Sequence, residues 1–348
     1  MPKVGAQALT ERERSALYGM CRHPTLNDRE LGLSMGMRTS TVTAIRHRLV
    51  QRRLVRKVRV PMPQRLGKEI FFVGYGSFSR PGSRAHREVL GSAAESLGPV
   101  FLFAEGGANG FFMGAAKNYT ETKKCIDGFA HSIHGHDLAA QPWTYVIFPF
   151  QVSKVLNFFD MSHVVARLLG VRGADEVAVP QLSYEECGSV PLSQKARDIL
   201  AGLSMWPEES DIFTAEQVGA SRQAVSRLRK RFEDGGVLKT LYLPDLKALG
   251  GELMALSHVG FNPRCVLRDR REGVRMLLRE SPHVFVISGS FECVMLHAFR
   301  DYQEYEAARN KLYSFYRSHE FLQGEPRTVL FSSENPRYLK YFDFAGML

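Results

Sequence analysis

One histidine-rich segment is the only place in the sequence where residue types and spacing suggest metal chemistry. The stretch HSIHGHD carries His131, His134 and His136 beside an aspartate. Imidazole and carboxylate groups ligate zinc and other divalent ions. The stretch also falls at the expected end of a helix, where the helix dipole favours histidine, and only its last two residues recur later, as His319-Glu320. We therefore predict that these histidines hold no metal.

Other patterns with chemical potential are weaker. The glycine-rich runs GYGSF and EGGANG lack the strand-to-helix context and the GK[ST] ending of a phosphate-binding loop. No Ser-His-Asp or Cys-His arrangement can be recognised from spacing. The five cysteines stand singly, without a CxxC pair, which predicts reduced thiols and no zinc site. The sequence thus predicts no cofactor.

The sequence shows no membrane or export signal. The first residues, MPKVGAQALTERERS, include no apolar signal core, so we do not expect export. No apolar run approaches the roughly 18 residues that a membrane helix needs. We expect a cytoplasmic protein without a membrane partner.

The net charge of +10 is unevenly distributed. Residues 9–68 contain fourteen Lys and Arg against four Asp and Glu, whereas residues 191–251 contain nine against eight. A basic surface confined to one region is typical of proteins that bind a polyanion. A solvated basic surface without a partner remains the alternative.

The chain repeats itself at a constant offset. Pro61–Glu69 reads PMPQRLGKE and Pro244–Glu252 reads PDLKALGGE, with Pro, Leu, Gly and Glu at equal positions. The offset that carries Pro61 onto Pro244 aligns residues along most of the chain, which predicts two tandem copies at about 9–161 and 192–344.

Each copy begins with the pattern of three short helices and a β-ribbon. In the first copy, Thr10 and Glu13 form a capping-box pattern, Asn27 is placed to cap a second helix, and apolar residues recur at helical spacing in RTSTVTAIRHRLVQRRLVR. In the second copy, Ser221 is placed to cap the third helix, ASRQAVSRLRKRFEDGGVLK. This order predicts a winged helix-turn-helix in each copy.

The third helices carry the residue types that read DNA. A helix fits the major groove, where side chains near its start reach base edges and flanking cations hold phosphates. Some of these arginines could serve only to solubilise the helix. The predicted DNA-binding residues are Thr39, Ser40, Thr43, Arg46, Arg48, Arg52, Arg53, Arg56 and Lys57 in the first copy, and Arg222, Gln223, Ser226, Arg227 and Lys230 in the second.

The rest of each copy alternates strands and helices in the order βαββαβ, which predicts a ferredoxin-like sheet with helices on one face. The expected fold class is α+β, with two tandem copies of a winged helix-turn-helix and a ferredoxin-like domain. The expected segments are the winged helix-turn-helices 1–66 and 191–249, the ferredoxin-like domains 67–161 and 250–348, and a linker at 162–190.

This sequence of elements resembles the Lrp/AsnC (leucine-responsive, feast/famine) regulators. TAEQVGASRQAVSRLRKRFEDGGVLK is similar to the family's DNA-binding helices, and VFVISGSFECVMLHAFRDYQEYE is similar to the centre of its ligand-sensing domain. The resemblance covers both copies and implies a transcriptional regulator that binds double-stranded DNA. Two copies in one chain imply a pseudo-dimer that reads two unequal half-sites and assembles further into a homodimer.

The resemblance also implies a small-molecule effector at the turn between the middle strands. The family usually has Gly with a nearby Asp there. This chain departs from that pattern, which does not fit an ordinary amino-acid effector. The candidate effector residues are Gly106, Gly107 and Asn109 in the first copy, and Gly289, Ser290 and Glu292 in the second.

An enzyme of the same architecture is the alternative. Siroheme decarboxylases share this two-part organisation, and a basic lobe could attract a tetrapyrrole with many carboxylates. A resemblance to them would imply a histidine and an arginine around the middle strands, but FLFAEGGANGFFM and FVISGSFECVM contain neither. The sequence therefore favours the DNA-binding regulator and predicts no enzymatic activity.

Overall fold

The structure is a computed structural model that describes residues 9–171, 188–265, 267–333 and 336–348. The chain has a mixed α/β fold. The elements of the first half are α1 (Glu11–Arg22), α2 (Asp28–Ser34), α3 (Thr39–Gln51), β1 (Val55–Pro61), the 3-10 helix η2 (Pro63–Leu66), β2 (Ile70–Ser77), α4 (Arg84–Ser96), β3 (Val100–Gly106), β4 (Asn109–Ala116), α5 (Tyr119–Gly135), β5 (Thr144–Pro149), the 3-10 helix η3 (Phe150–Val152), β6 (Lys154–Phe158) and α6 (Ser162–Leu169).

The second half repeats the order of α-helices and strands found in the first. From α1 to β6, each α-helix and strand has a counterpart whose first residue lies at the same offset, the one that carries Glu11 onto Gln194. These elements are α7 (Gln194–Met205), α8 (Asp211–Gln217), α9 (Arg222–Asp234), β7 (Leu238–Pro244), β8 (Leu253–Gly260), α10 (Leu267–Glu280), β9 (His283–Ser288), β10 (Glu292–Phe299), α11 (Tyr302–Ser318), β11 (Arg327–Ser332), β12 (Arg337–Tyr341) and the 3-10 helix η4 (Ala345–Met347).

The chain folds into two compact units that each combine segments from both halves. Unit 1 comprises Met1–Lys57, Lys154–Ser183 and Leu241–Glu334. Unit 2 comprises Val58–Ser153, Tyr184–Thr240 and Asn335–Leu348. The helices α1 to α3 therefore belong to the same unit as the second half's sheet, and α7 to α9 to the same unit as the first half's sheet.

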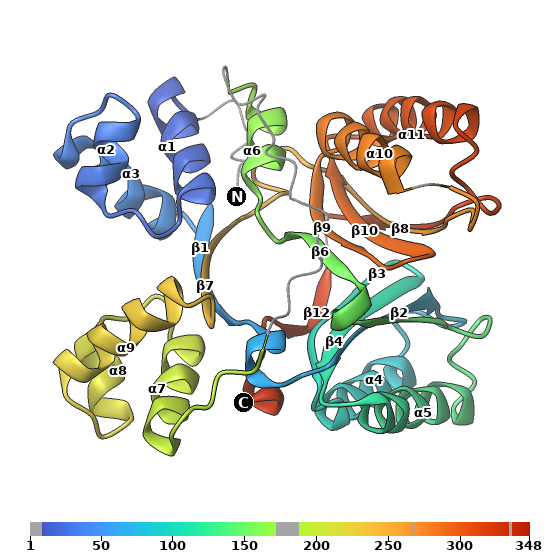
Figure 1. Cartoon of the computed structure of the whole chain (residues 1–348), viewed down its shortest axis with the longest axis horizontal. Coiled ribbons are helices and arrows are strands. Elements are labelled where there is room, and N and C mark those ends of the chain that lie inside the picture. The colour runs from blue at the N-terminus through green and yellow to red at the C-terminus, as the bar shows by residue number, and fades with distance from the viewer. Residues whose placement is uncertain (1–8, 172–187, 266, 334–335) are drawn as a thin grey trace. The chain divides into compact units, whose positions relative to one another are not determined.

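Each unit contains a five-stranded antiparallel sheet. The order in unit 2 is β12-β3-β4-β2-β5, and the order in unit 1 is β11-β8-β10-β9-β6. In unit 2, α4 and α5 cover one face of the sheet, and in unit 1, α10 and α11 do so (Figure 1). In the part of the chain that the structure describes, every helix is too short or too polar to span a bilayer.

The fifth strand of each sheet comes from the other half of the chain. Strand β6 pairs with β9 in unit 1, and β12 pairs with β3 in unit 2. Lys154 lies opposite Ser288 in the first pairing, and Arg337 lies opposite Glu105 in the second, so the two exchanges use equivalent positions. The exchange thus places Arg337, in the second half of the chain, beside β3 of the first half.

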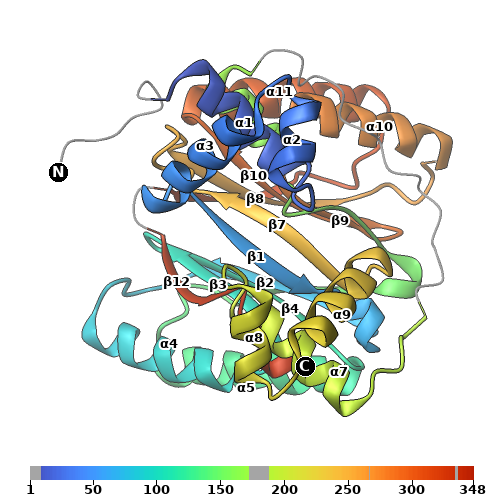
Figure 2. The same ribbon diagram turned by 90° about the vertical axis from the view of Figure 1, so that its left-hand side faces the viewer.

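Strands β1 and β7 form a separate two-stranded ribbon, which is visible in Figure 2. The division between the units runs through both strands. At the unit 2 end, the Met62 amide donates to the Val237 carbonyl at 2.8 Å. At the unit 1 end, the Asp245 amide donates to the Leu54 carbonyl at 2.9 Å. At each end of the ribbon, a backbone hydrogen bond within one unit thus joins the segments that flank β1 and β7.

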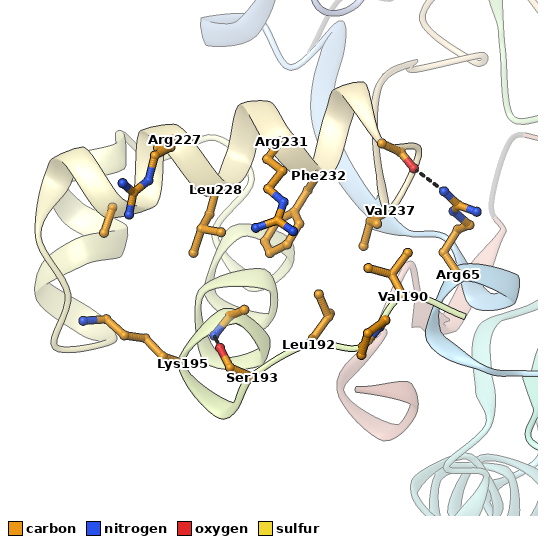
Figure 3. A pocket seen from close by; sticks show the side chains of 14 residues that line it. Arg65, Val190, Leu192, Ser193, Lys195, Arg227, Leu228, Arg231, Phe232 and Val237 are labelled. Atoms are coloured by element: carbon orange, nitrogen blue, oxygen red, sulfur yellow. Dashed lines mark hydrogen bonds between the residues drawn. The ribbon is translucent and has the colours of Figure 1, made fainter. Parts of the chain in front are cut away.

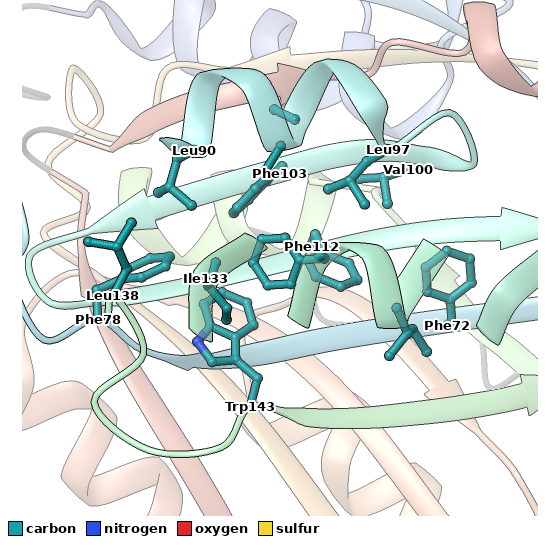
Figure 4. Packing of buried hydrophobic residues seen from close by; sticks show 14 of the residues in the cluster. Phe72, Phe78, Leu90, Leu97, Val100, Phe103, Phe112, Ile133, Leu138 and Trp143 are labelled. Carbon is teal, nitrogen blue, oxygen red and sulfur yellow. The ribbon is translucent and has the colours of Figure 1, made fainter. Parts of the chain in front are cut away.

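Aromatic side chains fill the core of unit 2 between the sheet and the helices α4 and α5 (Figure 4). Phe112 lies at its centre, 5.0 Å from the Phe129 ring and 6.0 Å from the Trp143 ring between centroids. Its own ring lies so close to Gly74 that a Cβ there would be 2.3 Å from it. Position 74, which pairs with Phe112 on the neighbouring strand, therefore requires glycine.

Candidate functional site

Helix α3 of unit 1 carries the predicted first-copy DNA readers, and two of them bond within the chain. Arg46 Nε lies 2.7 Å from Asp28 Oδ1, and Arg46 Nη1 donates to the Tyr242 hydroxyl. The Thr43 hydroxyl donates to Asp28 Oδ2 at 2.7 Å. Asp28 therefore ties α3 to α2 through both side chains, and Arg46 is half-buried.

The corresponding contact recurs in α9 of unit 2. Arg229, the counterpart of Arg46, pairs with Asp211 at 3.0 Å and with Glu233 at 3.4 Å. Burial alone would raise the pKa of Asp211, but its hydrogen bonds and charge pairing with Arg229 outweigh burial and lower the pKa. The two central arginines thus hold the three-helix groups together.

The other predicted DNA-binding residues lie mostly at the surface. Arg48 pairs with Glu13 at 3.6 Å, so its charge is partly neutralised. Ser226 and Lys57 are half-buried. The exposed members are Thr39, Ser40, Arg48, Arg52, Arg53 and Arg56 in the first half and Arg222, Gln223, Arg227 and Lys230 in the second.

The predicted effector residues lie at the two hairpin turns, one in each unit. Gly106, Gly107 and Asn109 surround the β3–β4 turn, where Asn109 Oδ1 accepts from the Ser77 hydroxyl at 2.7 Å. Gly289, Ser290 and Glu292 surround the β9–β10 turn. Here Glu292 lies 3.3 Å from His258, and Arg270 donates to the Gly289 carbonyl at 2.7 Å. Their role as an effector site stays a prediction.

The histidines of HSIHGHD do not converge. His131 and His134 are exposed on α5, and His136 Nδ1 bonds to the Ser132 carbonyl oxygen at the helix end. Within the described ranges, no group of three or more His, Cys, Asp or Glu side chains is arranged to hold a metal ion.

A histidine, a carboxylate and an arginine meet at the C-terminal end of β3 in unit 2. His86 Nε2 on α4 lies 2.7 Å from Glu105 Oε2, and Arg337 Nη1 on β12 lies 3.0 Å from Glu105 Oε1. Each carboxylate oxygen thus contacts one partner. Because the two oxygens of one carboxylate bind two different side chains, the imidazole of His86 and the guanidinium of Arg337 are held in a fixed relative position.

This cluster is enclosed on the histidine side and open on the arginine side. His86 is 1% exposed, and the edge of its ring packs against Phe78 at 4.7 Å between centroids. The Arg337 side chain is 40% exposed. In unit 1, the equivalent strand positions hold Ser288 and Lys154, so the unit 1 sheet lacks this cluster.

Three histidines, of which His283 and His297 are buried and His163 is half-buried, form a second cluster in unit 1. The rings of His163 on α6 and His283 on β9 are 5.1 Å apart, and His297 on β10 pairs with His283 across the strands. Burial, together with nearby His283, lowers the pKa of His163 and of His297 to about 3. Burial also lowers the pKa of His283. All three are therefore neutral at physiological pH.

Two adjoining pockets lie in unit 2 beside α9 and α7. The first, of about 510 Å³, has the cations Arg65, Lys195, Arg227 and Arg231 in its lining (Figure 3). The second, of about 480 Å³, shares Val190–Leu192 with the first and adds Lys68, Lys117 and Arg197. Neither lining includes an Asp or Glu side chain.

Sequence reasoning missed the cluster at β3 because its members are far apart in the chain. His86 is 19 residues from Glu105, and Arg337 is 232 residues from it. The histidine and the arginine were expected on the middle strands themselves, whereas His86 lies on α4 and Arg337 on β12. The only local signal was Glu105, a carboxylate in the otherwise apolar strand FLFAEG.

Comparison with known proteins yields matches in structure alone. No protein-family model and no curated protein sequence matches the chain. The fold matches the siroheme decarboxylase NirDL with a TM-score of 0.52 and 12% identity, over 94% of this chain and 92% of that one. NirDL in complex with an iron-uroporphyrin III analogue matches with the same score and identity, over 96% of both chains.

An AsnC family transcriptional regulator from Agrobacterium tumefaciens matches over 40% of this chain and 89% of its own, with 15% identity and a TM-score of 0.33. The full-length matches correct one expectation from the sequence. The prediction that the chain has no enzymatic activity is wrong, because along 94–96% of its length the fold matches that of an enzyme.

Proposed function

We propose that the chain is a decarboxylase that acts on a carboxylated tetrapyrrole of the siroheme class. The observation that carries the proposal is the meeting of His86, Glu105 and Arg337 at β3. The resemblance to siroheme decarboxylases implied a histidine and an arginine at the middle strands, and their apparent absence was the main argument against an enzyme. The full-length likeness in fold to NirDL supports the same function.

Each residue of the cluster has a task that suits decarboxylation. Loss of a carboxyl group as CO2 breaks a C–C bond and leaves an electron pair on carbon, which a proton must take up. Arg337 donates one hydrogen bond to Glu105. The guanidinium has further N–H donors that can bind a substrate carboxylate. The His86–Glu105 pair then supplies the proton as a positioned general acid.

The contacts of α3 and α9 support this proposal over a DNA reader. Arg46 and Arg229 occupy equivalent positions on the two helices, and both bind aspartates of their own units. A base-reading arginine must instead offer its bidentate donors to guanine. In this respect the central arginine of each third helix serves the protein's own packing.

The proposal extends to the architecture. The segments 1–66 and 67–161, and 191–249 and 250–348, are two copies of a winged helix-turn-helix and a ferredoxin-like domain that arose by tandem duplication. Recurrence of the elements at a constant offset along the chain supports this. The segment 162–190, which includes α6, joins the copies, and its residues 172–187 lie outside the described residues. Further assembly into a homodimer stays a prediction.

Substitutions in the cluster test the proposed function. The full chain is incubated with siroheme, and loss of CO2 is followed by mass spectrometry. Glu105→Gln and Arg337→Gln should each reduce turnover about a hundredfold or more, as expected for loss of a general acid or of carboxylate orientation. Arg84→Gln, a change on the exposed face of α4, is the matched control and should leave turnover unchanged.

The outcome that contradicts the proposal is full turnover in both cluster variants. Circular dichroism establishes that each variant is folded. Arg337→Lys separates charge from geometry, because lysine keeps the positive charge but cannot bind two carboxylates in a planar fork. We expect this variant to bind substrate with little change in KM and to lose most of its kcat.

A further inference from the structure

The cationic side chains of the first pocket lie on one face of α9 and on the elements opposite. Arg227 and Arg231 are one helical turn apart, and Lys195 on α7 faces them across the pocket (Figure 3). Like charges at this spacing repel each other. Among the described residues, neither arginine forms an ion pair, although Arg229 on the same helix pairs with two acids. The repulsion thus persists on the pocket side of the helix.

The first half of the chain shows that the three-helix fold does not require this charge. The counterpart of Arg227 is Ala44, and the counterpart of Arg231 is Arg48. The charge of Arg48 is partly neutralised by Glu13, at 3.6 Å. In the second half, the position of Glu13 is occupied by Ala196, which lines the pocket. The second half therefore gains one cation and loses the acid that would neutralise the other.

Apart from the cations, the lining of the pocket is largely apolar. Leu192, Leu228, Phe232 and Val237 supply it, and the volume of about 510 Å³ falls within the usual range for small-molecule sites. The adjoining pocket shares the apolar residues Val190–Leu192 with the first and has three further cations in its lining. A ligand that fits has an apolar body and several anionic groups at its rim.

We propose that these pockets form a binding site for a polycarboxylated tetrapyrrole, separate from the cluster at β3. The macrocycle would lie against the apolar lining, and its peripheral carboxylates would pair with Arg227, Arg231 and Lys195. Arginine suits this task because its planar fork binds a carboxylate through two hydrogen bonds. None of His86, Glu105 and Arg337 lines either pocket, so the site holds a tetrapyrrole away from the reacting groups. The choice of a tetrapyrrole rests on the proposed function, whereas the preference for an anion does not.

The test is a titration of the full chain with iron uroporphyrin III, followed by absorbance. The background variant Arg337→Gln removes the arginine of the cluster, so that the binding measured reports the pockets. In this background, Arg227→Gln and Arg231→Gln should each weaken binding by about tenfold, the value of one charge-assisted contact. Arg222→Gln with Lys230→Gln removes two exposed cations of the same helix that do not line the pocket, and should leave the affinity unchanged.

Two results would overturn the inference. The first is a loss of affinity in the control variant as large as in the pocket variants or larger, because binding would then follow net charge, or no loss in the pocket variants. The second is displacement of the porphyrin by duplex DNA at lower concentration, with the same arginines responsible, because the face would then bind nucleic acid. The proposed function is tested separately by siroheme turnover. If the wild-type chain fails to release CO2 while the pocket variants lose porphyrin binding, the decarboxylase proposal fails and the binding site stands.

Discussion

The histidine cluster of unit 1 should make the protein less stable in mild acid. His297 is 4% exposed on β10, and its pKa is lowered to about 3 by burial and by the neighbouring His283. The unfolded chain binds a proton near pH 6.5, whereas the folded chain does not. The contribution of this imidazole to stability is therefore fully present above pH 6.5 and is lost as the pH falls toward 3.

The size of the effect follows from the shift. Between pH 7 and pH 5, the unfolded state of His297 takes up about three-quarters of a proton and the folded state almost none, which costs about 2 kcal/mol. His163, whose pKa is also lowered to about 3, adds a similar amount. Together the two histidines should lower the free energy of unfolding by about 4 kcal/mol over this range. This is a large fraction of the stability of a typical domain.

The assay is urea unfolding at pH 7 and pH 5, followed by circular dichroism. His297→Leu removes the titrating group and fills a similar volume, so its loss of stability on acidification should be about 2 kcal/mol smaller than that of the wild type. His134→Asn, at an exposed position on α5, is the control and should show the wild-type difference. An unchanged pH dependence in His297→Leu would refute the reasoning.

Three further predictions concern packing and the ion pairs of the helices. Phe112→Ala should lower the free energy of unfolding by about 3 to 5 kcal/mol, because it leaves a cavity at the centre of the unit 2 core, and urea unfolding measures the loss. Gly74→Ala should cost about 1 to 3 kcal/mol in the same assay, because the new Cβ would meet the Phe112 ring at 2.3 Å. Asp211→Asn should destabilise the protein by about 1 to 3 kcal/mol at pH 7, and by less at a pH low enough to protonate the wild-type carboxylate, whose pKa the pairing with Arg229 lowers. Equal losses at both pH values would show that the pairing with Arg229 contributes nothing.

Local elements could be predicted from the sequence because their determinants are local. The Thr10–Glu13 capping box begins α1 as expected, and the Ser221 side chain accepts from the Ala224 amide at the start of α9. The stretches RTSTVTAIRHRLVQRRLVR and ASRQAVSRLRKRFEDGGVLK, in which helices were expected, contain α3 and α9. In each case, residues within one or two turns decide the conformation.

Contacts between distant segments were beyond this reasoning. The aromatic runs NFFD and KYFDF lie at the ends of β6 and β12, the exchanged strands. Nothing in a short strand specifies which of two similar sheets it joins. The meeting of His86 and Arg337 at Glu105 depends on that exchange, so it is as hard to predict as the exchange itself.

The measurement that tests the central claim most directly is the mass of siroheme after incubation with the wild-type chain. The proposed function predicts a product that has lost one or more CO2, with a proton from solvent in place of each carboxyl group. Incubation in D2O should therefore give one deuterium for each CO2 lost. Siroheme that is bound and returned unchanged, together with selective binding of duplex DNA by the same chain, would contradict the decarboxylase and favour the regulator.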